Sequence, residues 1–230
     1  MLIFLPGLIC DASIYAAQTA AFRDSKAIDG YGLADSLPAM AQQVLDQSPE
    51  RFDLFGHSMG GRIALEVFRL APERVRRLAL VSTGVHPLQP GEPEKRHALC
   101  QIGHDQGFGA LVDAWLPPMV APDRLEDEEL MAPLRAMCIR AGLDVFEAQI
   151  RALLGRGDQQ GLLSEISCPT LVMTGEKDSW APPAQHQGIA AAITDAELVI
   201  VPGAGHMIQP EAPEAVNAAI ASWLARPVND

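Results

Sequence analysis

The sequence predicts an α/β fold, a mostly parallel central sheet of about six strands flanked by helices, with an inserted helical cap. Short apolar runs alternate with stretches whose apolar residues recur at helical spacing. Such runs are typical of strands buried on both faces, and helices between them favour parallel pairing. In addition, the interval between residues 82 and 170 contains no convincing strand and exceeds a normal crossover connection.

Six apolar runs are the candidate strands. In chain order they are Leu2–Leu5, Lys26–Ile28, Phe52–Phe55, Leu78–Ser82, Thr170–Thr174 and Leu198–Val201. The second run is faint. Right-handed crossovers between these strands would place their carboxyl ends at one edge of the sheet.

Two helices outside the long interval have clear patterns. In Gly61–Leu70 the apolar face is Ile63, Val67 and Leu70. Arg62 and Glu66 lie four residues apart on the other face, a spacing that predicts a surface ion pair. The helix Pro213–Leu224 starts with proline in its first turn and turns Val216, Ile220, Trp223 and Leu224 inward.

Residues 87–165 are predicted to form the cap, and we call them the cap segment. Residues 1–86 and 166–230 would form the core domain. The cap helices are expected at Glu94–Gln106, Phe108–Trp115, Asp127–Ala141 and Val145–Leu154. A cap over the carboxyl edge of the sheet would cover the place where open α/β folds bind ligands.

Composition excludes several classes of partner. The chain has 230 residues and a formal net charge of −12. Phosphate backbones and anionic lipid surfaces need clustered Lys and Arg, so neither nucleic acid nor membrane is an expected partner. Four cysteines without metal-site spacing suggest reduced thiols. With neither a signal-peptide pattern nor a membrane-length apolar run, we expect a cytoplasmic protein that acts on a small molecule.

Residues Gly56 to Gly60, with the sequence GHSMG, match the nucleophile-elbow pattern G-x-S-x-G. They lie between a predicted strand and a predicted helix, where a sharp turn would present a serine hydroxyl. Ser58 is therefore the candidate nucleophile. It needs a base and a group that orients the base.

His206 is the candidate base, because it follows the last strand in a glycine-rich loop at the edge that also receives Ser58. The other histidines fall in the elbow or on segments expected in the cap, a hinge or a helix surface. Asp178 ends the loop after the preceding strand and is the candidate acid, with Glu176 as a competitor. Structural alternatives are a helix N-cap for Asp178 and an ordinary loop role for His206.

An oxyanion formed on attack would need two N–H donors. Met59 would supply one at the start of the elbow helix. The loop Leu5–Leu8 follows the first strand, and the N–H of Leu8 is the second candidate.

The chain resembles the α/β-hydrolase family through four motifs in the family's order: LPGL, GHSMGG, TGEKD and PGAGHMIQPEAPE. The resemblance implies that Ser58 is the nucleophile, His206 the base and Asp178 its orienting acid, with Leu8 and Met59 as oxyanion donors. Many members have His-Gly at the oxyanion loop, where this chain has Pro6-Gly7. Members also usually begin with an antiparallel hairpin; without it, a sheet edge would be exposed or would pair with a second copy in a homodimer.

The leading hypothesis is hydrolysis of a carboxylic ester, lactone or thioester through an acyl-enzyme. One alternative is carbon–carbon bond cleavage, or a lyase step like that of certain menaquinone-pathway enzymes. Arg62, in GHSMGGR, resembles the arginine that those enzymes have after the elbow. A second alternative is a non-catalytic ligand receptor. The sequence has no H-E-x-x-H and no G-x-G-x-x-G after a strand, so we expect no metal and no cofactor. A mostly apolar pocket is expected from Phe108, Trp115, Leu116, Met119, Met137, Phe146 and Trp180.

Overall fold

A computed structural model of the chain describes residues 1–228. It contains a six-stranded sheet in the order β2-β1-β3-β4-β5-β6, and every neighbouring pair is parallel, which confirms the predicted fold class. The strands are β1 (Leu2–Leu5), β2 (Ser25–Ala27), β3 (Phe52–His57), β4 (Val75–Val81), β5 (Thr170–Gly175) and β6 (Ala196–Val201). Each overlaps a predicted run, and the differences are confined to the ends of the strands.

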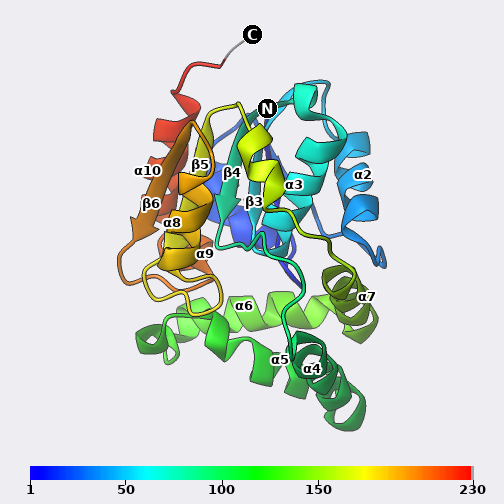
Figure 1. Ribbon diagram of the computed structural model, residues 1–230. Coiled ribbons are helices and arrows are strands. Elements are labelled where there is room, and N and C mark those ends of the chain that lie inside the picture. Colours follow the sequence, from blue (N-terminus) through cyan, green and yellow to red (C-terminus); the bar gives the residue numbers. More distant parts are fainter. Residues whose placement is uncertain (229–230) are drawn as a thin grey trace.

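Helices cover the sheet (Figure 1). Those outside the cap segment are α1 (Ala16–Ala21), α2 (Leu37–Gln47), α3 (Met59–Leu70), α8 (Pro183–Ala191), α9 (Ile208–Glu211) and α10 (Pro213–Leu224). Helix α2 packs beside α3, and α1 packs beside α10. On α10 the indole N–H of Trp223 donates a 3.0 Å hydrogen bond to the carbonyl of Pro169, which ties this helix to the start of β5.

The central strands β1 and β3 are buried throughout. Phe4 of β1 stacks on Tyr15, with ring centroids 4.8 Å apart, and meets Phe55 of β3 edge to face at 5.3 Å. The hydroxyl of Tyr15 donates to the carbonyl of Leu5 at 2.6 Å, so its polar end is satisfied inside the core. This packing gives the carboxyl ends of β1 and β3 a rigid base.

Helix α3 corrects one prediction. Arg62 and Glu66 do not form a surface pair: both are buried, and the carboxylate of Glu66 accepts from Arg69 at 2.8 Å. The end of the cap segment, after α7, covers this face, because the side-chain amide of Gln159 donates to the Arg62 carbonyl and to Glu66. Leu70 was expected inside but is 43% exposed at the end of the helix.

The cap segment contains α4 (Glu92–Gln106), α5 (Phe108–Trp115), α6 (Glu128–Ala141) and α7 (Leu143–Leu154). These helices lie beyond the edge of the sheet to which the strand arrows point (Figure 1). Asp127 caps the N-terminus of α6, where its side chain accepts from the N–H of Leu130 at 3.2 Å. The division of the chain into a core and a cap domain stays a prediction.

Short 3₁₀ turns complete the chain: η1 (Ala12–Tyr15), η2 (Pro72–Arg74), η3 (Pro117–Met119), η4 (Pro122–Arg124) and η5 (Gly161–Glu165). Within residues 1–228, no helix has both the length and the apolar character needed to cross a bilayer. The edges of the sheet are β2 and β6. Homodimer formation through an edge stays a prediction, and the three-residue length of β2 limits what it could pair.

Candidate active site

The elbow at Ser58 is a strained turn between β3 and α3. Ser58 has φ 56° and ψ −118°, a region that residues with a side chain rarely occupy. A Cβ added at Gly56 would lie 2.4 Å from the carbonyl oxygen of Gly60, and one added at Gly60 would lie 2.2 Å from that of Leu5. Both glycines are therefore required by close backbone contacts, and the elbow lies against the Leu5–Leu8 loop.

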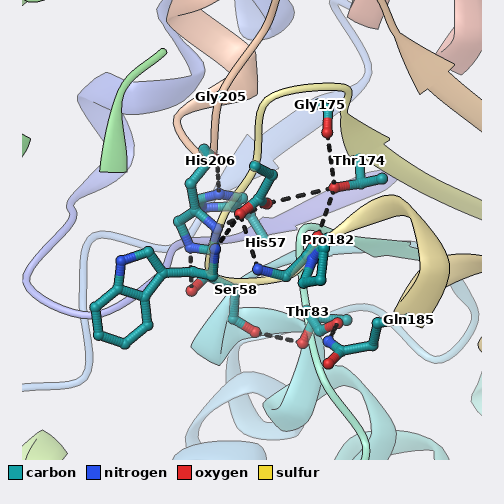
Figure 2. A network of polar contacts seen from close by, with 12 residues as sticks. His57, Ser58, Thr83, Thr174, Gly175, Pro182, Gln185, Gly205 and His206 are labelled. Carbon is teal, nitrogen blue, oxygen red and sulfur yellow. Dashed lines mark hydrogen bonds and ion pairs between the residues drawn. The ribbon is translucent and has the colours of Figure 1, made fainter. Parts of the chain in front are cut away.

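Ser58, His206 and Asp178 meet in one hydrogen-bonded chain. The Ser58 Oγ is 2.9 Å from the His206 Nε2, and the His206 Nδ1 is 2.9 Å from an Asp178 carboxylate oxygen. Figure 2 shows Ser58 and His206 within the surrounding polar network. Because the carboxylate can only accept, Nδ1 carries the proton and Nε2 can accept the serine hydroxyl. The competitor Glu176 instead accepts from the N–H of Gly203 at 3.0 Å.

Asp178 also organises its own turn. One carboxylate oxygen accepts from the N–H groups of Trp180 and Ala181 at 2.9 and 2.8 Å, while the other faces His206. Burial by itself would raise the pKa of Asp178, but the charge and hydrogen bond of His206, together with the Ala181 N–H, hold this pKa at about 2. The capping alternative is therefore compatible with the orienting role, since different oxygens serve each.

The His206 loop is fixed from several sides. The backbone N–H groups of His206 and Met207 donate to the carbonyl of Met119 at 2.9 and 3.0 Å. The ring N–H of His57 donates from Nε2 to the His206 carbonyl at 2.8 Å. Burial, and then the proximity of His206, lower the pKa of His57 to about 3, so this ring stays neutral at physiological pH.

Glu211 links the same loop to the cap segment. Its buried carboxylate accepts from the N–H groups of Ala121 and Gly205 at 2.9 and 2.8 Å. Burial raises the pKa of this carboxyl group above its usual value. One acidic side chain thus anchors the residue before His206 and a turn of the cap segment together.

Behind the serine lies a second polar layer. The Thr83 hydroxyl donates to the Ser58 carbonyl at 2.7 Å, and the Thr83 N–H donates to the His186 Nε2 at 3.1 Å. Gln185 donates to the Thr83 carbonyl at 2.7 Å (Figure 2). His186 was expected on a helix surface, but it is buried, because α8 packs against β5 and brings it under the loop after β4.

The two candidate oxyanion donors, Leu8 and Met59, line the same cavity as Ser58. A Cβ at Gly7 would lie 3.1 Å from the Ser58 Cβ, so the lack of a side chain lets this loop approach the serine. Among the described residues, no three His, Cys, Asp or Glu side chains are grouped so that they could hold a metal ion.

A cavity of about 520 Å³ opens above the serine. Trp115, Met119 and Trp180 line it as predicted. The other four predicted lining residues, Phe108, Leu116, Met137 and Phe146, do not. Phe146 instead packs on Phe108, with ring centroids 6.3 Å apart, because these side chains fill the space between the cap helices.

The cavity is mostly apolar, as expected, but it also carries a group of charged side chains. Arg62, Lys95, Arg96 and Arg156 line it, together with Glu92. Nothing in the sequence indicated that the charged residues of the cap segment would line the cavity. The position of Arg62 could have been found from the sequence, because it follows Ser58 by four residues and therefore lies on the same helical face as the nucleophile.

Comparisons with known proteins identify the family of the chain. The alpha/beta hydrolase family matches residues 3–219. The chain belongs to this family. A relative from Pseudomonas putida, the dihydrolipoyllysine-residue acetyltransferase component of an acetoin cleaving system, is 32% identical over 228 residues. That match covers 90% of this chain but only 58% of the relative's length.

Two solved structures are similar over almost the whole α/β-hydrolase chain. A thermophilic esterase from Thermogutta terrifontis, with malate bound, has a TM-score of 0.88 and 26% identity over 97% of this chain and 88% of its own. The enol-lactonase from Burkholderia xenovorans LB400 has a TM-score of 0.86 and 26% identity over 98% and 91%. Both proteins are named for cleaving an ester bond, one of them in a ring.

Proposed function

We propose that this protein is a serine hydrolase that cleaves a carboxylic ester of a small molecule, or a lactone or thioester, through an acyl-enzyme on Ser58. The observation that carries the proposal is the hydrogen-bonded chain from Ser58 through His206 to Asp178, with both distances at 2.9 Å. The strained elbow and the cavity above the serine support it. Similarity to an esterase and to a lactonase supports the same class of reaction.

In the proposed mechanism, the Ser58 Oγ attacks the ester carbonyl carbon as its proton passes to the His206 Nε2. The carbonyl oxygen becomes an oxyanion, which the N–H groups of Leu8 and Met59 would stabilise. Collapse of this intermediate breaks the carbon–oxygen bond, and His206 gives its proton to the departing alcohol. Asp178 keeps the imidazole in the correct tautomer and stabilises its charged form.

Deacylation repeats these steps with water. His206 removes a proton from the water, the resulting hydroxide attacks the acyl carbon, and the acid is released as Ser58 regains its proton. The cavity walls would position the acyl group for this attack.

The direct test combines labelling with turnover. A fluorophosphonate probe should label the wild-type protein at Ser58, and short-chain p-nitrophenyl esters should turn over repeatedly. Ser58→Ala should abolish labelling and lower kcat by several orders of magnitude, because the covalent intermediate cannot form. Ser167→Ala is the matched control, because Ser167 is exposed, does not line the cavity and should leave labelling intact.

Labelling that survives Ser58→Ala would overturn the assignment of the nucleophile. A labelled wild-type protein that turns over neither esters nor lactones would argue for the carbon–carbon or lyase alternatives. A protein that binds esters without any labelling would argue for a receptor.

A further inference from the structure

One wall of the cavity concentrates positive charge within a protein whose net charge is −12. Arg96 and Arg156 share a single carboxylate, Glu92: Arg96 donates to it at 2.9 Å and Arg156 at 2.8 Å. The side chain of Arg156 is 1% exposed, so its position is set by these contacts rather than by solvent. Glu92 thus forms ion pairs with two arginines, so this single carboxylate leaves an excess of positive charge on the wall.

Arg62 is a third arginine on this wall. Its guanidinium donates to the carbonyl of His86 at 3.1 Å, but no carboxylate of the described residues forms an ion pair with it. Arg62 is 6% exposed, and burial, followed by the nearby charge of Arg156, lowers its pKa to about 9. A buried guanidinium without a counter-charge is costly unless an anion is supplied from elsewhere.

The position of Arg62 relative to Ser58 limits what that anion can be. Ser58 precedes α3 and Arg62 lies one turn into it, about 6 Å further along the helix axis. Long side chains of a helix lean back toward its N-terminus, so the guanidinium reaches the cavity beside the serine. An anion held there would be part of the same small molecule whose carbonyl Ser58 attacks.

We propose that Arg62, with Arg156 and Arg96 behind it, forms a carboxylate-binding subsite, and that the preferred substrate is an ester or lactone carrying a free carboxylate a few carbons from the scissile carbonyl. The planar fork of a guanidinium matches the two oxygens of a carboxylate. The proposal rests on the proposed hydrolase function, because it assigns the anion to the substrate of Ser58. Positive charge in a cavity with low-dielectric walls also raises the local concentration of an anionic substrate.

The test compares two substrates with the same adipoyl chain, mono-p-nitrophenyl adipate and its neutral methyl ester. In the wild-type protein, kcat/KM for the anion should exceed that for the neutral ester by about tenfold or more, and added salt should reduce this preference. Arg62→Met should lower the ratio at least tenfold. Arg62→Lys keeps the charge without the planar fork and should give an intermediate ratio.

Arg135→Met is the matched control, because Arg135 is an exposed cap arginine paired with Asp113 and should leave the ratio unchanged. Binding is measured separately as the rise in Tm that free adipate produces, which should be present in the wild type and lost in Arg62→Met. If Arg62→Met does not fold, two other results test the subsite. The ratio of kcat/KM for the anionic and neutral esters should be lower in Arg62→Lys than in the wild type, and salt should lower this ratio in the wild type.

The two proposals fail differently. Equal kcat/KM for both esters in the wild type would overturn the carboxylate subsite while leaving the hydrolase function intact. Absence of turnover together with an adipate-induced Tm rise that depends on Arg62 would support the subsite and overturn the hydrolase function.

Discussion

Gln149 of α7 accepts a 2.7 Å hydrogen bond from the backbone N–H of Ile9, at the end of the loop that carries Leu8. The Gln149 side chain is buried, so this contact is protected from water. Ile9 has φ 48°, a left-handed conformation that is rare for a β-branched residue. A side chain from the cap segment therefore holds this loop in a conformation that it would otherwise avoid.

Gln149→Ala should lower both activity and stability. It leaves a buried N–H without a partner, which typically costs about 1–3 kcal/mol. Release of the Leu8 loop should lower kcat for p-nitrophenyl butyrate by about tenfold or more, as expected when an oxyanion donor is displaced. Gln101→Ala, an exposed cap substitution, should change neither kcat nor Tm. Stability loss with an unchanged kcat would separate this contact from catalysis.

His206→Ala should lower kcat about as much as Ser58→Ala, because the two side chains would act as one unit. The double variant should then be scarcely slower than either single variant. Asp178→Asn should reduce kcat strongly, since it removes the carboxylate that selects the His206 tautomer. Steady-state rates of the four variants test this, and losses that multiply in the double variant would mean independent roles.

The buried His57 should make the fold sensitive to acid. Its pKa is about 3 in the folded protein, against about 6.5 in an unfolded chain. Its contribution to stability is therefore complete above about pH 6.5 and is lost as pH falls toward 3, by roughly 1.4 kcal/mol per pH unit at most. The physical reason is burial: protonation would add a proton at Nδ1, which has no hydrogen-bond partner among the described residues, and would charge a ring that is shielded from water.

Urea unfolding between pH 7 and 4 measures this effect. His57→Gln should flatten the pH dependence of the free energy of unfolding, even if the variant is less stable at pH 7. His97→Gln, at an exposed position of α4, should leave the slope as in the wild type. An equal slope in wild type and His57→Gln would assign the acid sensitivity to other groups.

Glu211→Ala should destabilise the protein by about 2–5 kcal/mol, because two buried N–H groups lose their acceptor. Glu211→Gln keeps an acceptor oxygen and should be much milder. Burial raises the pKa of Glu211 in the folded protein. The free energy of unfolding therefore falls as pH rises from the ordinary carboxyl pKa through this raised pKa, because the buried group becomes charged. The difference between Glu211→Gln and the wild type should therefore shift in favour of Gln with rising pH, as thermal unfolding at pH 5 and 8 would reveal.

Trp115 and Phe146 should behave differently although both are buried aromatic residues of the cap segment. Trp115→Ala enlarges the cavity and should shift the preference among acetyl to decanoyl p-nitrophenyl esters toward longer chains. Phe146→Ala removes packing between cap helices and should cost about 3–5 kcal/mol of stability. Its ratios of kcat/KM across chain length should match the wild type, and a shifted optimum would place Phe146 in the substrate site after all.

Sequence pattern was sufficient wherever the structural requirement is local. The alternation of buried strands and helices predicted the parallel sheet, because a strand covered on both faces has to be apolar along its whole length. The glycines around Ser58 predicted the elbow, since backbone atoms approach within the space of a side chain there. Ser58, Asp178 and His206 each follow a predicted strand, and parallel strands bring their carboxyl ends to one edge of the sheet.

Only the tertiary structure decided which polar residues face solvent and which face the cavity. Helical periodicity groups Arg62 with Glu66, but it carries no information on the distant chain that covers this face, here Gln159. The same holds for His186, which lies on the buried side of α8, and for Gln149, whose hydrogen-bond partner Ile9 lies 140 residues away in the sequence. Burial and hydrogen-bond partners depend on which segments meet in space, so the positive wall of the cavity was decided by packing rather than by pattern.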